Sequence, residues 1–479
     1  MSGILSLRPS QHKDRTSMNR SVDSAYGLLY ADDGLGQLCN KALLEAPADH
    51  LTRMMVLCHL AAPTTPAVHL AEAVGGDLNA VRSAYHYCRD GRPVSQLVES
   101  LFYPYRLRWS FAAATVAEWR RTPDRPARIL AHEPAIADTV EIHPTRGTCN
   151  YRCAMCLWSD QQDLTYTTKQ LDRDGVMTLA EWRRILTELN QQGVRRLVVS
   201  GGGEALINPD LPEILHTAAD LGFEICVYTT GFSMRPGTTL AEALMRCHRI
   251  RFSIHSPDAS TYERIAGTRP AQRAFDRVKR NVRAILDVRD EAPHVGIGFV
   301  IQVLNYWQIE RMVEFSEELG VDWLDIRKDE VDVTEGLTDG QLEVVRDQLR
   351  RVRSRSSGRM RIDIGDELVS VANGQTVDRS RTTECLARYF RPTIGAYGHY
   401  TPCDLQAEPR FAESSFNLGV VKNSGITDVI TDSSGRRIPD ECSQCMPSSR
   451  TGNAVLHKLL ADLQAGIGVS EQPFSRNLH

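Results

Sequence analysis

The chain lacks the long apolar runs that form membrane-spanning helices. No apolar stretch reaches the roughly 18 residues that a spanning helix needs, and the opening MSGILSLRPSQHKDRTSMNR has no apolar core of a signal peptide. The chain also lacks an excess of either charge, because 56 Lys and Arg oppose 60 Asp and Glu for a net charge of −4. We therefore expect no membrane partner, no nucleic-acid partner and a cytoplasmic location.

Cysteine, in contrast, is abundant. A chain expected in a reducing compartment does not form structural disulfides, yet this one has 12 cysteines. Seven fall into two groups by their spacing, namely Cys149, Cys153 and Cys156, then Cys385, Cys403, Cys442 and Cys445. The other five stand alone in apolar or helical surroundings and are expected to be small core residues. The grouped cysteines predict metal or redox chemistry.

The hydrophobic pattern divides the chain into four segments. Residues 1–135 are predicted to form an all-helical N-terminal domain, because from about residue 35 apolar residues recur at every third or fourth position, as in LTRMMVLCHLAA. Residues 136–355 alternate short β-branched runs with helical stretches. Residues 356–446 contain shorter strand-like pieces with Gly and Pro, and residues 447–479 hold a terminal helix and a tail.

The second segment predicts an α/β fold with a parallel sheet. Its six strand-like runs are TVEIHPT, RRLVVSGGG, EICVYTTG, RIRFSIHS, VGIGFVIQ and DWLDIRKD, and helical stretches separate them. Strict alternation of strand and helix is typical of parallel sheets, and six such units suit a partial (β/α)6 TIM-like barrel. An open, doubly wound sheet is the alternative. In both folds the functional groups lie at the carboxyl ends of the strands.

The first cysteine group has the pattern CxxxCxxC, in TRGTCNYRCAMCLWSD, directly after the first predicted strand. Three thiolates can hold three irons of a cubane cluster, and without a fourth nearby ligand the last iron stays open to a small molecule. Zinc is the alternative, but zinc prefers four ligands in paired CxxC spacing. We therefore expect a catalytic 4Fe-4S cluster at Cys149, Cys153 and Cys156.

This loop resembles the signature of the radical S-adenosylmethionine (SAM) superfamily. The resemblance spans about residues 139–335 and includes SGGGEAL, which matches the GGE motif, and FSIHSPDASTYERIAG, which looks like the SIDG segment. It implies that the open iron binds the amino and carboxylate groups of SAM. It also implies that an electron cleaves SAM to a 5′-deoxyadenosyl radical, which takes a hydrogen atom from the substrate. The electron would come from a donor such as flavodoxin or ferredoxin.

The same resemblance assigns contacts to SAM. Glu204, with the two preceding glycines, would bind the methionyl amine, and Ser253 would face the ribose or the carboxylate. Arg264 would pair with the carboxylate, or else lie on a helix surface. His255 stands where many relatives have aspartate. The cofactor-binding set implied in this way is Met155, Gly202, Gly203, Glu204, Ser253, Arg264, Val300, Ile301 and Arg327, with Val300 and Ile301 against the adenine.

The second cysteine group has the pattern C-x12-G-x4-C from Cys385 to Cys403, followed by Cys442-x2-Cys445. Four thiolates satisfy a closed tetrahedral site, for which zinc and iron-sulfur are the options. The pattern resembles the twitch domain, a short form of the SPASM module, which implies an auxiliary 4Fe-4S cluster. Because no cysteine follows Cys445, the longer pattern with a second auxiliary cluster is excluded.

Polar residues at the ends of the third and sixth predicted strands are the candidate catalytic groups. They are Tyr228, Asp329 and Glu330, with Arg327 beside them. A packed tyrosine and a structural ion pair are the alternatives. Carboxylates at a barrel mouth suit a cationic, polyhydroxylated amine, and Tyr228 could donate a proton or a hydrogen bond to a hydroxyl group.

The helical leader, together with VYTTGF and LDIRKDE, is similar to radical SAM deaminases and diol dehydratases of amino-sugar antibiotic pathways, such as those for desosamine and apramycin. This resemblance favours a lyase that dehydrates the 3′,4′-diol of the aminoglycoside paromamine to a 3′-deoxy-4′-ketone. A separate NAD(P)H-dependent reductase could then reduce the ketone. The alternatives are a dehydrogenase that oxidises an amino-sugar or aminocyclitol alcohol through the auxiliary cluster, and a maturase of a ribosomal peptide.

Overall fold

The computed structural model describes residues 124–145, 149–156, 175–269, 273–329, 336–355, 360–365, 384–407 and 416–438, with isolated positions between 368 and 464. These residues all lie in one compact unit, Leu107–Gln472. Of the predicted helical domain, only the end is described, with helix α8 at Asp124–Leu130. Within the described ranges no helix has the length and apolar character needed to cross a membrane.

One sheet of 10 strands organises this unit, in the order β10-β9-β8-β1-β2-β3-β4-β5-β6-β7. From β1 to β7 the strands follow one another in chain order and are all parallel. A doubly wound sheet reverses its strand order, so this order excludes that alternative. The strands are β1 (Thr139–Ile142), β2 (Arg196–Val199), β3 (Glu224–Thr229), β4 (Arg249–Ser253), β5 (His294–Ile301), β6 (Trp323–Lys328) and β7 (Arg361–Ile364).

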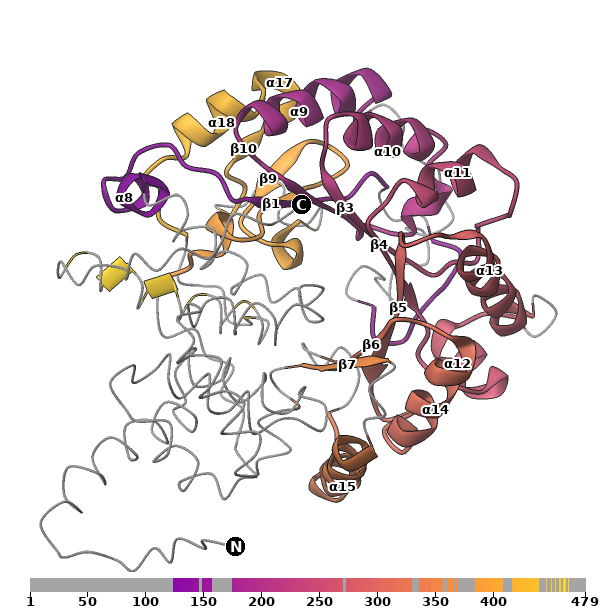
Figure 1. The fold of residues 1–479 in the computed structure, drawn as a ribbon. Coiled ribbons are helices and arrows are strands. Elements are labelled where there is room, and N and C mark those ends of the chain that lie inside the picture. The colour runs from indigo at the N-terminus through magenta and orange to yellow at the C-terminus, as the bar shows by residue number, and fades with distance from the viewer. Residues whose placement is uncertain are drawn as a thin grey trace, which may run out of the picture. The chain divides into compact units, whose positions relative to one another are not determined.

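Helices cover the outer face of the curved sheet (Figure 1), as expected for a partial barrel wound in one direction. They are α9 (Leu179–Gln191), α10 (Leu211–Asp220), α11 (Thr239–Met245), α12 (Ala259–Ala266), α13 (Ala274–Val288), α14 (Ile309–Leu319) and α15 (Asp339–Arg355). Local sequence sets their ends. At α9, for example, Thr178 and Glu181 form a reciprocal capping box.

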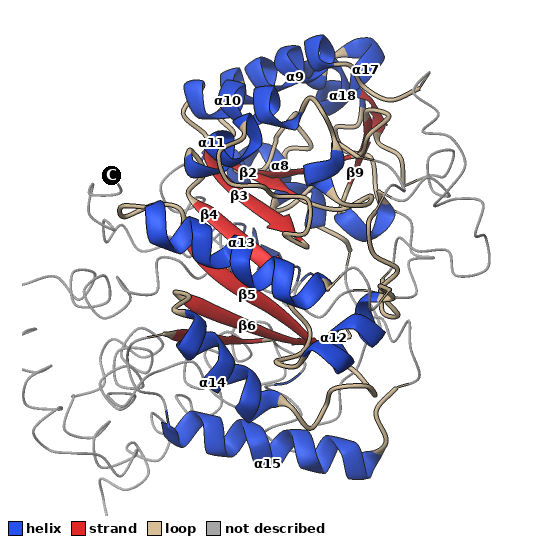
Figure 2. Ribbon diagram, turned by 90° about the vertical axis from the view of Figure 1, so that its right-hand side faces the viewer, coloured by secondary structure: helices blue, strands red, loops and turns tan. Residues whose placement is uncertain are grey.

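The core lies between the sheet and these helices (Figure 2), and alternate strand residues point into it. On β4, Ile250 and Phe252 are fully buried, and on β5 Ile297 and Phe299 are as well. The residues between them point to the concave face, which is polar. Strand register places Tyr228, Arg251 and Gly296 side by side on that face. The partial barrel therefore has an apolar outside and a polar inside.

The C-terminal part extends the same sheet beyond β1. Strand β8 (Thr393–Ile394) pairs parallel with β1, β9 (His399–Thr401) pairs antiparallel with β8, and β10 (Gly419–Val420) with β9. Helices α17 (Val421–Ser424) and α18 (Ile426–Asp432) follow. Arg184 on α9 donates to the carbonyl of Val421 at 2.9 Å, and Glu188 accepts the Ile426 N–H at 2.7 Å. These bonds attach the C-terminal helices to α9.

Candidate active site

The first cysteine group lies in a loop that is fastened to the last turn of α12. The backbone N–H groups of Arg152 and Ala154 donate to the carbonyls of Ala266 and Ile265 at 2.8 and 3.1 Å. Gly267 ends α12 with φ of +61°, and a Cβ there would lie 2.6 Å from the Arg152 carbonyl oxygen. Only glycine allows this approach. All three cysteines are partly exposed.

The glycine loop after β2 packs against the exit of β1. Gly201 and Gly202 have φ of +40° and +67°. A Cβ at Gly201 would lie 2.2 Å from His143 Nε2, and a Cβ at Gly202 would lie 2.2 Å from the Thr145 carbonyl oxygen. Any side chain here would therefore force the backbone apart. Because residues 143–145 lead into the cysteine loop, the packing brings the two motifs together.

Glu204 is the buried carboxylate of the site, with 2% of its surface exposed. Its Oε1 accepts the Thr229 hydroxyl at 2.5 Å and the Leu206 N–H at 3.1 Å, and its Oε2 accepts the Thr230 N–H at 2.7 Å. These donors fix the carboxylate between the ends of β2 and β3. Burial and the Glu204 charge both raise the pKa of the Cys149 thiol, to about 12. Glu204 thus lies close to the cysteines, where it can accept an ammonium group.

The donor set fits an iron-sulfur cluster with a polar ligand. With a pKa of about 12 the free Cys149 thiol is neutral, so metal ligation is what would hold it as a thiolate. Asn150 Nδ2 and Gln302 Oε1 are buried and have no hydrogen-bond partner in the part of the chain that the structure describes, as expected of groups that serve a ligand. Gln302 Nε2 donates to Met155 Sδ at 3.5 Å. Among the described residues, no three His, Cys, Asp or Glu are arranged to hold one metal ion.

The ends of β4 and β5 are tied together by His255 and Asn305. The Val300 N–H donates to His255 Nδ1 at 3.2 Å, and Asn305 Nδ2 donates to the carbonyls of His255 and Val300 at 2.8 Å each. Burial and the nearby Arg251 lower the pKa of His255 to about 3, so the ring is neutral. Ser253 lies on the concave face of β4 and is partly buried.

Two other residues that were predicted to contact SAM, Ile301 and Arg264, do not lie on the concave face of the sheet. Ile301 is fully buried and, by strand alternation, points to the face opposite Val300. Arg264 is exposed on α12. Asn305, Gln302 and Thr229 also belong to the site, although no sequence motif marks them. The signal that could have found them is their position at the ends of β5 and β3.

Arg251 on β4 links three strands on the polar concave face, because it contacts residues of β3 and β6. Its guanidinium carbon lies 3.8 Å from the centre of the Tyr228 ring, and its Nη1 donates to Asp325 at 2.8 Å. Arg327 Nε donates to the other Asp325 oxygen at 2.6 Å. A Cβ at Gly298 would lie 2.9 Å from Arg251 Nε, so glycine makes room for the arginine.

Of the three candidate catalytic residues, the structure describes Tyr228 and Asp329, and both are close to the carboxyl ends of strands. Burial is the main cause that raises the pKa of Tyr228, to about 12, so its hydroxyl is neutral and can donate. Asp329 follows β6, is 5% exposed, and its N–H donates to the Ile301 carbonyl at 2.9 Å. Glu330 lies outside the described residues.

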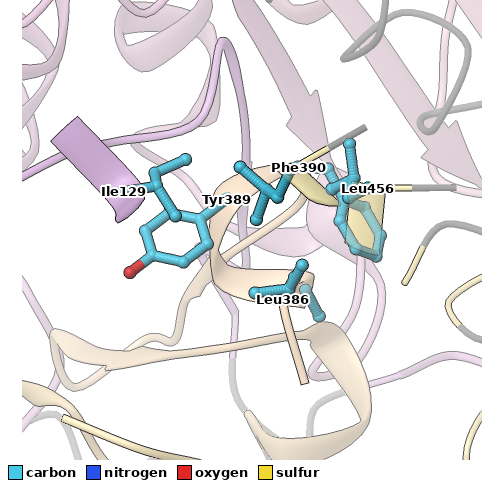
Figure 3. Packing of buried hydrophobic residues seen from close by; sticks show 7 residues of the cluster. Ile129, Leu386, Tyr389, Phe390 and Leu456 are labelled. Atoms are coloured by element: carbon cyan, nitrogen blue, oxygen red, sulfur yellow. The ribbon is translucent and has the colours of Figure 1, made fainter. Parts of the chain in front are cut away.

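Two of the late cysteines pack against one hydrophobic cluster. The cluster consists of Ile129, Leu386, Ala387, Tyr389, Phe390, Leu456 and Leu460 (Figure 3). Cys385 and Cys403 both pack against it, although 17 residues separate them in the sequence. Cys445 is buried, and Cys442 lies outside the described residues.

The segment that contains the cysteine loop and the glycine loop also matches a known protein family. Residues 144–316 match the profile of the Radical SAM superfamily. This segment is a radical SAM domain. Such a domain implies SAM and a catalytic 4Fe-4S cluster, the groups that the loop of Cys149, Cys153 and Cys156 and the Glu204 carboxylate fit.

Individual relatives cover part of the chain. The chain is 28% identical over 272 residues to a dTDP-4-amino-4,6-dideoxy-D-glucose ammonia-lyase of Streptomyces venezuelae, which covers 53% of each chain. It is 26% identical over 241 residues to a PqqA peptide cyclase of Streptomyces rochei, covering 48% of this chain and 62% of that one. Streptococcus suis SuiB bound to the precursor peptide SuiA gives a TM-score of 0.49 at 17% identity, over 64% and 67% of the chains. The matched regions span 53% and 62% of these two curated relatives.

Proposed function

We propose that this chain is a radical SAM lyase that dehydrates a vicinal diol of an amino sugar, and that the 3′,4′-diol of paromamine is converted to a 3′-deoxy-4′-ketone. The observation that carries the proposal is the polar interior of the barrel, where Arg251 contacts both Tyr228 and Asp325 and so links three strands. Such an interior offers donors and acceptors to a substrate rich in hydroxyl and amino groups. The relative named as an ammonia-lyase of an amino sugar supports an elimination.

Cys149, Cys153 and Cys156 would hold the catalytic cluster, and Glu204, beside Gly202 and Gly203, would bind the ammonium group of SAM. When bound, the cluster and SAM supply a carbon-centred radical that removes a hydrogen atom from the substrate. The late cysteines would hold an auxiliary 4Fe-4S cluster. A donor such as flavodoxin or ferredoxin would supply the electron.

The residues of the barrel interior would then direct the elimination. Once the substrate has lost the hydrogen atom from C4′, Asp329, with Glu330 as the alternative, accepts the proton of the 4′-hydroxyl and passes it to the 3′-hydroxyl, which leaves as water. Tyr228, whose pKa of about 12 keeps it protonated, donates a hydrogen bond to the departing hydroxyl. Return to C3′ of the hydrogen atom first removed from C4′ completes the ketone, so diol becomes deoxyketone and water without net oxidation.

Dehydrogenation is the second candidate, because Cys385 and Cys403 pack on one hydrophobic cluster and could hold an electron acceptor. The substrate radical would give its electron to that acceptor and its hydroxyl proton to a base, leaving a ketone that keeps its neighbouring hydroxyl. A peptide maturase is a third candidate, supported by the relative named as a peptide cyclase.

The test is an anaerobic incubation of reconstituted protein with SAM, a reductant and paromamine, followed by mass spectrometry. The proposal predicts a product lighter by one water. A product lighter by two hydrogens would favour the dehydrogenase instead. Cys153→Ala is the control that should form neither product. Unchanged paromamine, together with SAM cleavage that needs Cys153, would remove this substrate and leave the radical SAM assignment standing.

A further inference from the structure

A buried ion pair connects the C-terminal cysteine segment to the first strand of the barrel. Glu141 lies in the middle of β1 and is 1% exposed. Its Oε2 accepts Arg391 Nε at 2.5 Å. Arg391 lies between Cys385 and Cys403, and its Nη2 also donates to Asp404 at 3.2 Å. The side chain of Arg391 is only 12% exposed. One arginine thus joins the segment of the late cysteines to the first barrel strand.

The other oxygen of the same carboxylate faces the glycine loop. Glu141 Oε1 accepts the hydroxyl of Ser200, the residue that begins SGGGE, and contacts His143 Nε2 at 3.0 Å. The His143 ring is also the group that a Cβ at Gly201 would strike. Each oxygen of Glu141 therefore holds a different part of the chain, Oε2 the C-terminal segment and Oε1 the glycine loop.

Neighbouring groups stabilise the negative charge of Glu141. Burial by itself would raise its pKa, but Arg391, His143 and Ser200 together outweigh burial and lower the pKa to about 2. The carboxylate is therefore ionised at neutral pH, and bonds to an ionised group are stronger than neutral ones. Backbone pairing between β1 and β8 holds the segment as well, because the Glu141 N–H donates to the Pro392 carbonyl at 2.9 Å.

We infer that Arg391 is a positioning residue that acts through Glu141 to hold the glycine loop in the conformation that binds SAM. Docking of the C-terminal segment and the shape of the SAM site are then coupled through one carboxylate. This inference rests on the radical SAM part of the proposed function, and it is independent of which substrate is dehydrated.

Arg388 provides a matched control. It is a buried arginine three residues before Arg391, but it donates to the carbonyls of Ser433 and Arg436 at 2.7 and 2.9 Å. It therefore links two parts of the C-terminal segment, and its hydrogen bonds to the described residues do not include one to β1. Removing its charge disturbs the same segment without cutting the connection through Glu141.

The experiment compares Arg391→Met with Arg388→Gln in the full, anaerobically reconstituted chain. Hydrogen-deuterium exchange is measured over residues 200–207, and the dissociation constant of SAM is measured by equilibrium binding. Arg391→Met should raise both the exchange rate of the glycine loop and the SAM dissociation constant about tenfold. Arg388→Gln should leave both at the native value.

A second variant keeps the test decisive, since a buried carboxylate that loses its partner can prevent folding. Glu141→Gln combined with Arg391→Met removes both charges and should loosen the glycine loop to a similar extent. Native exchange over residues 200–207 and native SAM binding in whichever of these variants folds would overturn the inference. The same loosening in Arg388→Gln would overturn it too. Neither readout requires paromamine, so failure of the proposed substrate leaves this test intact.

Discussion

The Glu204 carboxylate accepts the backbone N–H of Thr230 at 2.7 Å, so the end of β3 fixes the acidic group that follows β2. The Thr229 hydroxyl holds the other oxygen at 2.5 Å. With the Leu206 N–H as a third donor, the carboxylate keeps its charge in one place beside the cysteines. This arrangement explains why Thr229 should affect SAM binding through Glu204.

Thr229→Val is the variant that tests this relationship. It keeps the shape of the side chain and removes the hydroxyl that holds Glu204, so we expect the SAM dissociation constant to rise about tenfold. Thr217→Val is a matched control, because the one bond that the Thr217 hydroxyl makes to a described residue is to the Glu213 carbonyl on the exposed side of α10. Equal SAM binding by both variants and the native chain, measured at equilibrium, would show that Glu204 does not need Thr229.

Gly202→Ala should abolish SAM binding and destabilise the fold by about 2 kcal/mol or more. The added Cβ would lie 2.2 Å from the Thr145 carbonyl oxygen at a φ of +67°. Gly222 is the control, since it has a φ of +82° but no atom within 4 Å of an added Cβ. Gly222→Ala should cost only about 1 kcal/mol and retain SAM binding. Urea unfolding and SAM titration of the two variants distinguish a steric effect from backbone strain alone.

The fold and the motifs of the site follow from the sequence, whereas the contacts between motifs do not. Regular alternation of strands and helices predicts the barrel, and CxxxCxxC and SGGGE locate the cysteine and glycine loops. The sequence could not show that Arg391 reaches Glu141, because 250 positions separate the two residues. It also did not show that Arg251 and Asp325 pair inside the barrel, because β4 (RIRFS) and β6 (WLDIRK) each carry more than one charged residue and the pattern does not say which of them meet.

Stability should depend on pH through His255. Burial and Arg251 lower its pKa from 6.5 to about 3, so below pH 6.5 the unfolded chain takes up a proton that the folded chain refuses. The contribution of His255 is therefore present above its unfolded pKa of 6.5 and is lost as the pH falls toward 3.

Removing the titrating ring should make this pH dependence shallower. We expect His255→Gln to lose about 1 kcal/mol less stability than the native chain between about pH 7.5 and pH 5.5. Urea unfolding of both proteins at the two pH values measures this difference. Parallel losses in the two proteins would mean that His255 takes up its proton in the folded chain as well.

Tyr228→Phe tests the role of the interior hydroxyl. Phenylalanine keeps an aromatic ring for the Arg251 guanidinium, which lies 3.8 Å from the ring centre, so the change is confined to the hydroxyl group. We expect product formation to fall at least about 100-fold, while SAM binding stays native. Because the pKa of Tyr228 is about 12, the native rate should show no ionisation of this group below about pH 10. A variant that forms deoxyketone at the native rate would exclude Tyr228 from the elimination.

The central claim is that Cys149, Cys153 and Cys156 hold a 4Fe-4S cluster whose open iron binds SAM. The direct measurement is pulsed electron paramagnetic resonance of the reduced chain, with SAM isotopically labelled in its methionyl amino and carboxylate groups. The Cys385→Ser, Cys403→Ser variant removes any auxiliary signal. We predict hyperfine coupling from both labelled groups to one cluster, absent in Cys153→Ala. A mononuclear metal signal, or bound SAM without coupling to a cluster, would contradict the account.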